Sequence, residues 1–225
     1  MRQDVEAMSG AGEQQLQAIG SAGGHRVTTL DELRAIYPPP KQRSLDKQID
    51  HLDRHCRRLI ELSPFVLVAT ASVGGACDVS PKGGPPGFVH VLDDHRLVIP
   101  DATGNRRLDG LQNLLENPHA GLVFLIPGMG ETLRVNGTVV LTRDPALLDG
   151  LQTGGRPAEL ALVVTAVEAF IHCAKALIRS KLWEPGTWPQ ADEIPSAAEI
   201  LSDHIGTGDI AASAAALADS YANHI

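Results

Sequence analysis

Positive charge is scarce in this chain. Its 225 residues include 19 lysines and arginines against 27 aspartates and glutamates, which gives a formal net charge of -8. Broad binding to a nucleic-acid backbone requires a basic face, and none is visible in the sequence. An anionic membrane surface attracts polybasic segments, which are also missing. We therefore expect neither nucleic acid nor a membrane as a partner.

Cysteine is rare and long apolar runs are absent. Cys56, Cys77 and Cys173 stand far apart and form no C-x-x-C pair, which argues against a disulfide framework and for a reducing compartment. No run approaches the roughly 18 apolar residues of a membrane span, and the first residues lack the apolar stretch of a signal peptide. We expect a soluble, cytoplasmic protein.

The length fits one globular domain with extensions. Residues 1–24 are rich in Gly, Ala, Gln and Ser and are expected to form a mobile arm. The pattern then predicts N-terminal helices over 25–62, a central domain over 63–190, and a C-terminal helical tail over 191–225, either a pair of alanine-rich helices or one helix and a loop.

The predicted N-terminal helices follow apolar stripes. Thr29 and Glu32 have the spacing of a capping box, so a short helix is expected to start there. Residues 44–62 carry apolar side chains on one stripe, which predicts one long amphipathic helix that ends at Ser63.

From Phe65 the apolar period changes to that of strands. Six or seven strands are expected, and Pro81 is expected to break the second of them. Asp93-Asp94 is predicted to turn a hairpin. Leu133, Val135, Val139 and Leu141 share one strand face. Most connections are too short for a parallel doubly wound sheet, so the sequence predicts a mainly β fold, an antiparallel barrel with flanking helices.

The segment GNRRLDGLQNLLENP, which begins at Gly104, raises an electrostatic question. Arg106 and Arg107 stand at the positive end of a predicted helix, where an anion would offset their repulsion. Gly104 permits close backbone approach, and Asn105 is expected to cap the helix. The pattern indicates a phosphate site, with Lys82 as a third cation. The alternative is a pair of solvated arginines.

In the order of its motifs, from the S-P-K-G turn to the G-N-R-R helix, the chain resembles the FMN-binding split barrels related to pyridoxamine 5'-phosphate oxidase. The resemblance covers about Leu59 to Trp183. It implies a six-stranded antiparallel split β-barrel and a homodimer whose FMN lies in a cleft between the subunits. It does not imply the vitamin B6 oxidase itself, because Cys77, Ile99, Pro100 and Thr132 stand where that enzyme has other residues.

The resemblance also implies roles for individual residues. Arg106 and Arg107 would hold the FMN phosphate, with Asn105 and Lys82 beside it. Asp78, Val79 and Ser80 would run along the ring and the ribityl chain, largely through their backbone. Further contacts would come from Ile99, Pro100 and Thr132.

A second cluster lies in FIHCAKALIRSKLW. Lys175 and Arg179 are four residues apart on one predicted helix, and with Ser180 and Trp183 they form a candidate second wall of the flavin cleft. A cation there would stabilise the reduced ring. The alternative is an ordinary amphipathic helix with a basic outer face.

Other constellations are weaker. His51 and His55 have a zinc-compatible spacing, but no third ligand is evident, so no metal is expected. No general acid or base stands out. We expect a flavin-dependent oxidoreductase that uses a small-molecule substrate or a donor such as NAD(P)H. The alternatives are a non-catalytic flavin module, or the same barrel with deazaflavin or haem.

Overall fold

The computed structural model describes residues 26–102 and 104–224. The predicted N-terminal arm therefore lies outside the described residues. The chain divides into two compact units, residues 1–45 and 46–225. The first unit contains α2 (Leu30–Ile36), whose capping box is confirmed: Glu32 N donates to Thr29 Oγ1 (3.2 Å), and Thr29 N donates to Glu32 Oε2 (3.0 Å).

The long helix predicted over residues 44–62 is wrong as one element. It is split between α3 (Gln42–Asp46) and α4 (Arg54–Leu62). The backbone between them pairs with the sheet instead: Ile49 and Ala169 exchange both N–H···O bonds, at 3.0 and 2.7 Å. Asp53 then starts α4 by accepting hydrogen bonds from the backbone N–H groups of two first-turn residues.

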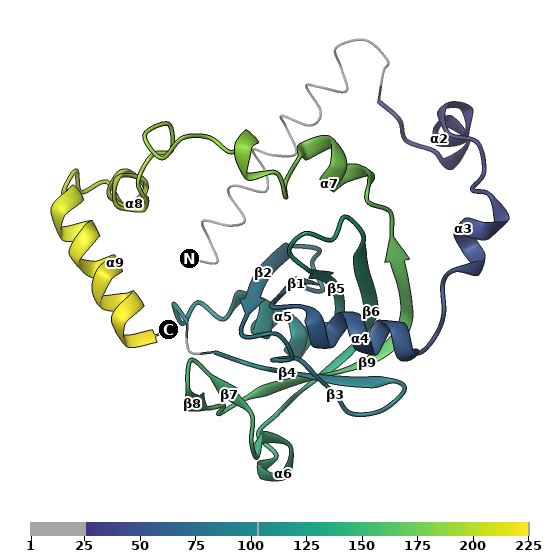
Figure 1. Ribbon diagram of the computed structural model, residues 1–225, viewed down its shortest axis with the longest axis horizontal. Helices are drawn as coiled ribbons and strands as arrows, with labels where there is room; N and C mark the ends of the chain where they lie inside the picture. Colours follow the sequence, from purple (N-terminus) through teal and green to yellow (C-terminus); the bar gives the residue numbers. More distant parts are fainter. Residues whose placement is uncertain (1–25, 103, 225) are drawn as a thin grey trace. The chain divides into compact units, whose positions relative to one another are not determined.

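Seven antiparallel strands form the main sheet, in the order β2-β1-β5-β6-β9-β4-β3. Their bounds are β1 Phe65–Ala71, β2 Cys77–Gly83, β3 His90–Val91, β4 Arg96–Pro100, β5 His119–Leu125, β6 Thr132–Thr142 and β9 Ala161–His172. The expected mainly β antiparallel fold with flanking helices is confirmed, with seven strands rather than six, because the short β3 adds an edge beside β4. Figure 1 shows α4 and α5 lying against this sheet.

Two strands extend further than the sequence suggested. β2 runs through Pro81 to Gly83, which the sheet tolerates because β2 is an edge strand, where a missing N–H is least costly. β9 continues beyond residue 167 to His172, past a bulge opposite Asn136 and Gly137. A Cβ on Gly137 would stand 2.1 Å from the carbonyl oxygen of Thr165, so only glycine fits there.

The remaining elements connect or follow the sheet. They are α5 (Asp109–Glu116), α6 (Pro145–Leu148), the hairpin of β7 (Gln152–Thr153) and β8 (Arg156–Pro157), α7 (Lys175–Ser180), the 3-10 turn η1 (Pro185–Thr187), α8 (Ala197–Ile205) and α9 (Ile210–His224). Of the two alternatives for the C-terminal tail, the structure has the pair of helices, and α8 and α9 pack on each other. In the part of the chain that the structure describes, no helix has the length and apolarity to cross a membrane.

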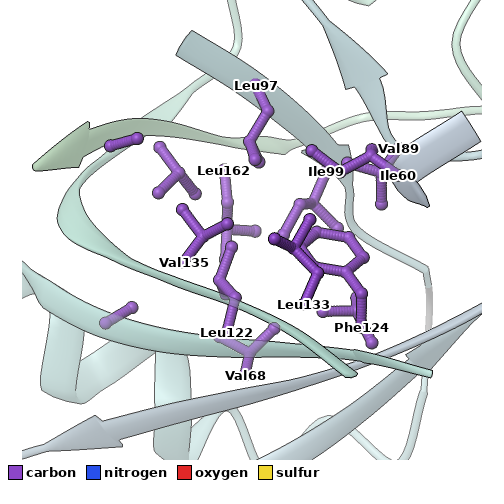
Figure 2. Packing of buried hydrophobic residues seen from close by; sticks show 14 of the residues in the cluster. Ile60, Val68, Val89, Leu97, Ile99, Leu122, Phe124, Leu133, Val135 and Leu162 are labelled. Carbon is purple, nitrogen blue, oxygen red and sulfur yellow. The ribbon is translucent and has the colours of Figure 1, made fainter. Parts of the chain in front are cut away.

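The core lies between the curled sheet and α4. Figure 2 shows side chains from several strands, among them Phe124, Leu133 and Ile99, pointing toward one another. Ile60 of α4 is fully buried in the same cluster. The alternating face predicted for β6 is confirmed, since Leu133, Val135 and Val139 are all buried. This packing fixes the strand ends that frame the site.

Candidate functional site

A cavity of about 590 Å³ opens between β2, the loop after β4, the start of α5 and the β7–β8 turn. Its described lining carries equal numbers of acidic and basic side chains: Asp78, Asp101, Asp109, Lys82, Arg106 and Arg107. Apolar walls come from Phe88, Leu111, Leu114 and Leu162, among others. The volume is that of an ordinary small-molecule site, and the mixed lining is also typical of one.

The strand β2 presents one polar face to this cavity. Asp78, Ser80 and Lys82 alternate along it and are each half-buried, whereas the residues between them are exposed. Lys82 Nζ forms an ion pair with Asp101, and the two side chains are only 16% and 15% exposed. A buried lysine charge needs such a partner, so the Lys82 charge is already balanced within the protein.

The two arginines lie in a constrained loop before α5. Arg106 and Leu108 both adopt left-handed backbone conformations, with φ of 61° and 62°. For residues other than glycine, each such conformation costs on the order of 1–3 kcal/mol, and they cluster at functional sites. Arg107 is held at both backbone groups, because its N–H donates to Asn105 Oδ1 (3.1 Å) and its carbonyl accepts from Gln112 Nε2 (3.2 Å).

The predicted helix cap is wrong in detail. Asn105 does not cap α5; Leu108 occupies the N-cap position and makes no side-chain capping bond. The Asn105 side chain instead bonds the loop itself, because the chain turns twice through left-handed residues before the helix begins. The arginines therefore precede the helix rather than forming its first turn.

The two guanidinium groups differ in their partners. Arg107 Nε donates to Asp109 Oδ2 at 2.7 Å, in an exposed pair. Asp109, and more weakly Asp78, raise the pKa of Arg107 above its ordinary value by stabilising the charged form. Arg106 makes no side-chain hydrogen bond or ion pair with any described residue. Arg107 is therefore held through one nitrogen, and Arg106 has no partner in the described part of the chain.

The carboxylate of Asp78 lies against the first turn of α5. Its Oδ2 is 2.9 Å from where a Cβ on Gly110 would stand, so the absence of a side chain at Gly110 makes room for it. Asn113 of the same helix donates to Thr70 Oγ1 at 3.1 Å and ties α5 to β1. These contacts set the cavity floor.

The structure brings eight of the predicted site residues to this cavity: Asp78, Val79, Ser80, Lys82, Pro100, Asn105, Arg106 and Arg107. The other six do not line it within one chain. Ile99 is fully buried in the core, and Thr132 begins β6. Lys175, Arg179 and Ser180 are exposed on α7, and Trp183 Nε1 donates to the carbonyl of Met129 at 2.8 Å.

Sequence reasoning missed three features of the cavity. Asp101 and Asp109 balance two of the cations, and the turn at Gln152 and Thr153 closes one side. A signal for Asp101 was present, because a half-buried lysine on an edge strand needs a nearby carboxylate. The sequence carried no such signal for the turn at Gln152 and Thr153, because only the folded chain brings this turn close to β2 and α5. Among the described residues, no group of three or more His, Cys, Asp or Glu side chains is arranged to hold a metal.

Solved structures with similar folds share little sequence with this chain. HupZ from Group A Streptococcus is 16% identical with a TM-score of 0.44, and the match covers 53% of this chain and 92% of HupZ. An FMN-binding protein from Syntrophomonas wolfei is 12% identical with a TM-score of 0.41, covering 63% of this chain and 95% of the other. A pyridoxamine 5'-phosphate oxidase-related, FMN-binding protein from Nostoc punctiforme is 13% identical with a TM-score of 0.39, covering 54% and 80%.

Comparison of the sequence, unlike that of the fold, identifies the family of this chain. A search of curated protein sequences finds no match. The family model for pyridoxamine 5'-phosphate oxidase, however, matches residues 52–173, which is more than half of the 225-residue chain. The matched segment contains the whole of β2, the arginine loop and α5. The chain therefore belongs to the pyridoxamine 5'-phosphate oxidase family.

Proposed function

We propose that the protein binds FMN in the cavity between β2, the arginine loop and α5, and that it is a flavin-dependent oxidoreductase. The observation that carries this proposal is the convergence of Arg106, Arg107 and the polar face of β2 on one cavity. Guanidinium groups bind phosphate oxygens in bidentate fashion. Among the residues that the structure describes, Arg106 has no side-chain partner and Arg107 bonds only through Nε, so both have terminal nitrogens for a phosphate.

The cavity suits the three parts of this cofactor. Its arginine loop fits the phosphate, the polar side chains of β2 fit a polyol, and the apolar walls near Phe88 and Leu111 fit a flat ring. The cavity volume of about 590 Å³ lies within the usual range of cofactor sites. When bound, the flavin would supply the hydride or electron transfer. This chain's residues would bind and orient it, and a donor such as NAD(P)H would reduce it.

The proposal includes a homodimer with the flavin cleft between subunits. In a single chain, Thr132 and the residues of α7 do not reach the cavity. A second copy is the natural source of a further wall, and Lys175, Arg179, Ser180 and Trp183 are our candidates for it. We also propose a cytoplasmic location, because the three cysteines are free in the structure.

The direct test is to purify the protein, release any bound small molecule by heat and identify it by mass. FMN supports the proposal, whereas a deazaflavin or haem would keep the fold and change the cofactor. Reduction of bound flavin by NAD(P)H would support an enzyme. A bound flavin that no donor reduces would indicate a non-catalytic flavin-binding module instead.

The mutational test replaces both Arg106 and Arg107 by Ala. Each charge-assisted contact contributes roughly 1.5–3 kcal/mol, so the loss of two should weaken FMN binding by about two orders of magnitude or more. The matched control replaces Arg54 and Arg58, which are exposed on α4 and outside the cavity lining. Equal FMN affinity in the two double variants, measured by quenching of flavin fluorescence, would place the phosphate elsewhere.

A further inference from the structure

The ion pair of Lys82 and Asp101 joins two parts of the sheet that are far apart in strand order. Lys82 belongs to β2 at one edge, and Asp101 directly follows β4, with β1, β5, β6 and β9 between these two strands in the sheet. The curl of the sheet nonetheless brings both side chains into the lining of one cavity. Both are mostly buried, so water and salt screen their attraction less than at the surface. The pair therefore links two distant strands across the cavity.

The backbone of each partner is fixed on its own side of the cavity. Lys82 stands opposite Val66 of β1 in the antiparallel register. The N–H of Asp101 donates to the carbonyl of Leu160, just before β9, at 2.9 Å. A side-chain pair between two such anchored positions resists their separation, because breaking it would leave two mostly buried charges without a partner.

Asp101 is also where the chain leaves the sheet for the arginine loop, residues 104–108. At its far end this loop is held by α5, because the carbonyl of Arg107 accepts a hydrogen bond from Gln112 Nε2 at 3.2 Å. A left-handed conformation such as that of Arg106 persists only where the surrounding structure fixes the backbone. The ion pair at Asp101 fixes the near end of the loop, as α5 fixes the far end.

The charges of the pair argue against Lys82 as a ligand of the phosphate. The ammonium and carboxylate groups together carry no net charge, and a phosphate drawn to Lys82 would also meet the repulsion of Asp101. Releasing Lys82 for the phosphate would leave a mostly buried carboxylate without its partner, which is costly. Arg106, by contrast, has no side-chain partner to give up among the described residues.

We infer that Lys82 and Asp101 are positioning residues: their ion pair ties the start of the arginine loop to β2 and holds both arginines in place for a phosphate that the pair itself does not bind. The inference rests on the proposed FMN function for the identity of the ligand and deepens it. The hold on the loop is a property of the protein without a ligand. The alternative is that Lys82 binds the phosphate directly.

The first measurement needs no flavin. Hydrogen exchange of the backbone amides of residues 104–108 is followed by mass spectrometry in the full chain after removal of bound small molecules. Asp101→Asn and Lys82→Met should each speed this exchange by about tenfold or more, because each breaks the hold on the loop. The matched control is Glu61→Gln, which breaks an exposed ion pair with Arg58 on α4 and should leave the exchange unchanged. Unchanged loop exchange in either cavity variant would overturn the inference.

The double variant Lys82→Met/Asp101→Asn serves if a single variant does not fold, because it leaves no unpaired charge in the cavity. Its loop should also exchange about tenfold faster than that of the wild-type protein. Direct binding of phosphate by Lys82 predicts no change in this ligand-free measurement.

The second measurement compares FMN with riboflavin, which lacks the phosphate, by fluorescence quenching. Asp101→Asn should lower the preference for FMN over riboflavin by about tenfold, the effect of one lost charge-assisted contact. If Lys82 bound the phosphate directly, the same variant would free its charge and raise that preference, which would overturn the inference. An equal loss for both probes would also overturn it, as the sign of a general structural defect. A wild-type protein that binds neither probe would refute the proposed function, and the exchange measurement would still test the hold on the loop.

Discussion

Arg106 combines a strained backbone with a side chain that has no partner within residues 26–102 and 104–224. At its φ of 61° the Cβ of any L-residue is crowded, which costs roughly 1–2 kcal/mol. Glycine avoids that cost but has no guanidinium group. The conformation persists because Asn105 and Gln112 fix the neighbouring backbone of Arg107. The loop thus has an arginine at a backbone conformation that glycine would adopt at lower free energy. This is expected if the guanidinium group binds a ligand.

This view predicts a matched pair of variants at one position. Arg106→Gly and Arg106→Ala should lose FMN affinity to the same extent, because both lack the guanidinium group. The glycine variant should be more stable than the alanine variant by about 1 kcal/mol, because only glycine relieves the left-handed strain. Urea unfolding of both proteins measures the difference. Equal stabilities would show that the loop relaxes around alanine and stores no strain.

The first turn of α4 is capped by one carboxylate, that of Asp53. Asp53 accepts hydrogen bonds from the N–H groups of His55 (2.9 Å) and Cys56 (2.8 Å). The bond from Cys56, and then the one from His55, lower the pKa of Asp53 below its ordinary value of 3.8. Since α4 buries Cys56 and Ile60 in the core, its first turn matters for the whole domain.

We expect Asp53→Ala to lower the free energy of unfolding by about 1 kcal/mol at pH 7, the usual contribution of an N-cap. The folded-state pKa is depressed, so this stabilisation is fully present above about pH 4 and fades as the pH falls through the folded pKa. Unfolding curves of both proteins at pH 7 and near pH 2.5 test the sign. A difference that grows on acidification would contradict this account of the cap.

The elements differ in how well the sequence predicts them. β6 was predictable, because Leu133, Val135 and Val139 alternate in a way that only a half-buried strand satisfies. The break between α3 and α4 was not, because the same apolar stripe serves a continuous helix and a bent chain. What decides it is the backbone pairing of Ile49 with Ala169, a contact between residues far apart in the sequence.

The candidate site shows the same division. The arginine pair and Lys82 stand out in the sequence as cations beside turn residues, and the cavity brings them together. The pairing of Lys82 with Asp101 depends on how β2 and the end of β4 meet across the cavity.

For the whole molecule, the outer face of the sheet carries exposed apolar side chains. Val140 and Val167 are 66% and 58% exposed, and Val167 borders a shallow hollow shared with Ala69 and Gly121. Exposed apolar side chains on a sheet face offer area for contact with another chain. A second copy of the chain is the occupant that our proposed dimer requires.

Val167→Glu should therefore shift the protein from dimer to monomer, because a charge in an apolar interface has no partner. Sedimentation equilibrium should give twice the chain mass of 23.9 kDa for the wild-type protein and the chain mass for the variant. Val73→Glu, at an exposed valine of the β1–β2 turn, is the matched control and should remain dimeric. A wild-type monomer at micromolar concentration would remove the dimer from the proposal.

The edge position of β2 affects how readily the protein aggregates. An unpaired strand edge readily recruits strands of other molecules, and this edge also bounds the cavity, so covering it permanently would obstruct the proposed site. Pro81, within β2, removes one backbone donor from this edge. The wall of the site thus lacks one of the backbone donors that a strand of another molecule would need, and replacing Pro81 should make the chain more prone to aggregate through this edge.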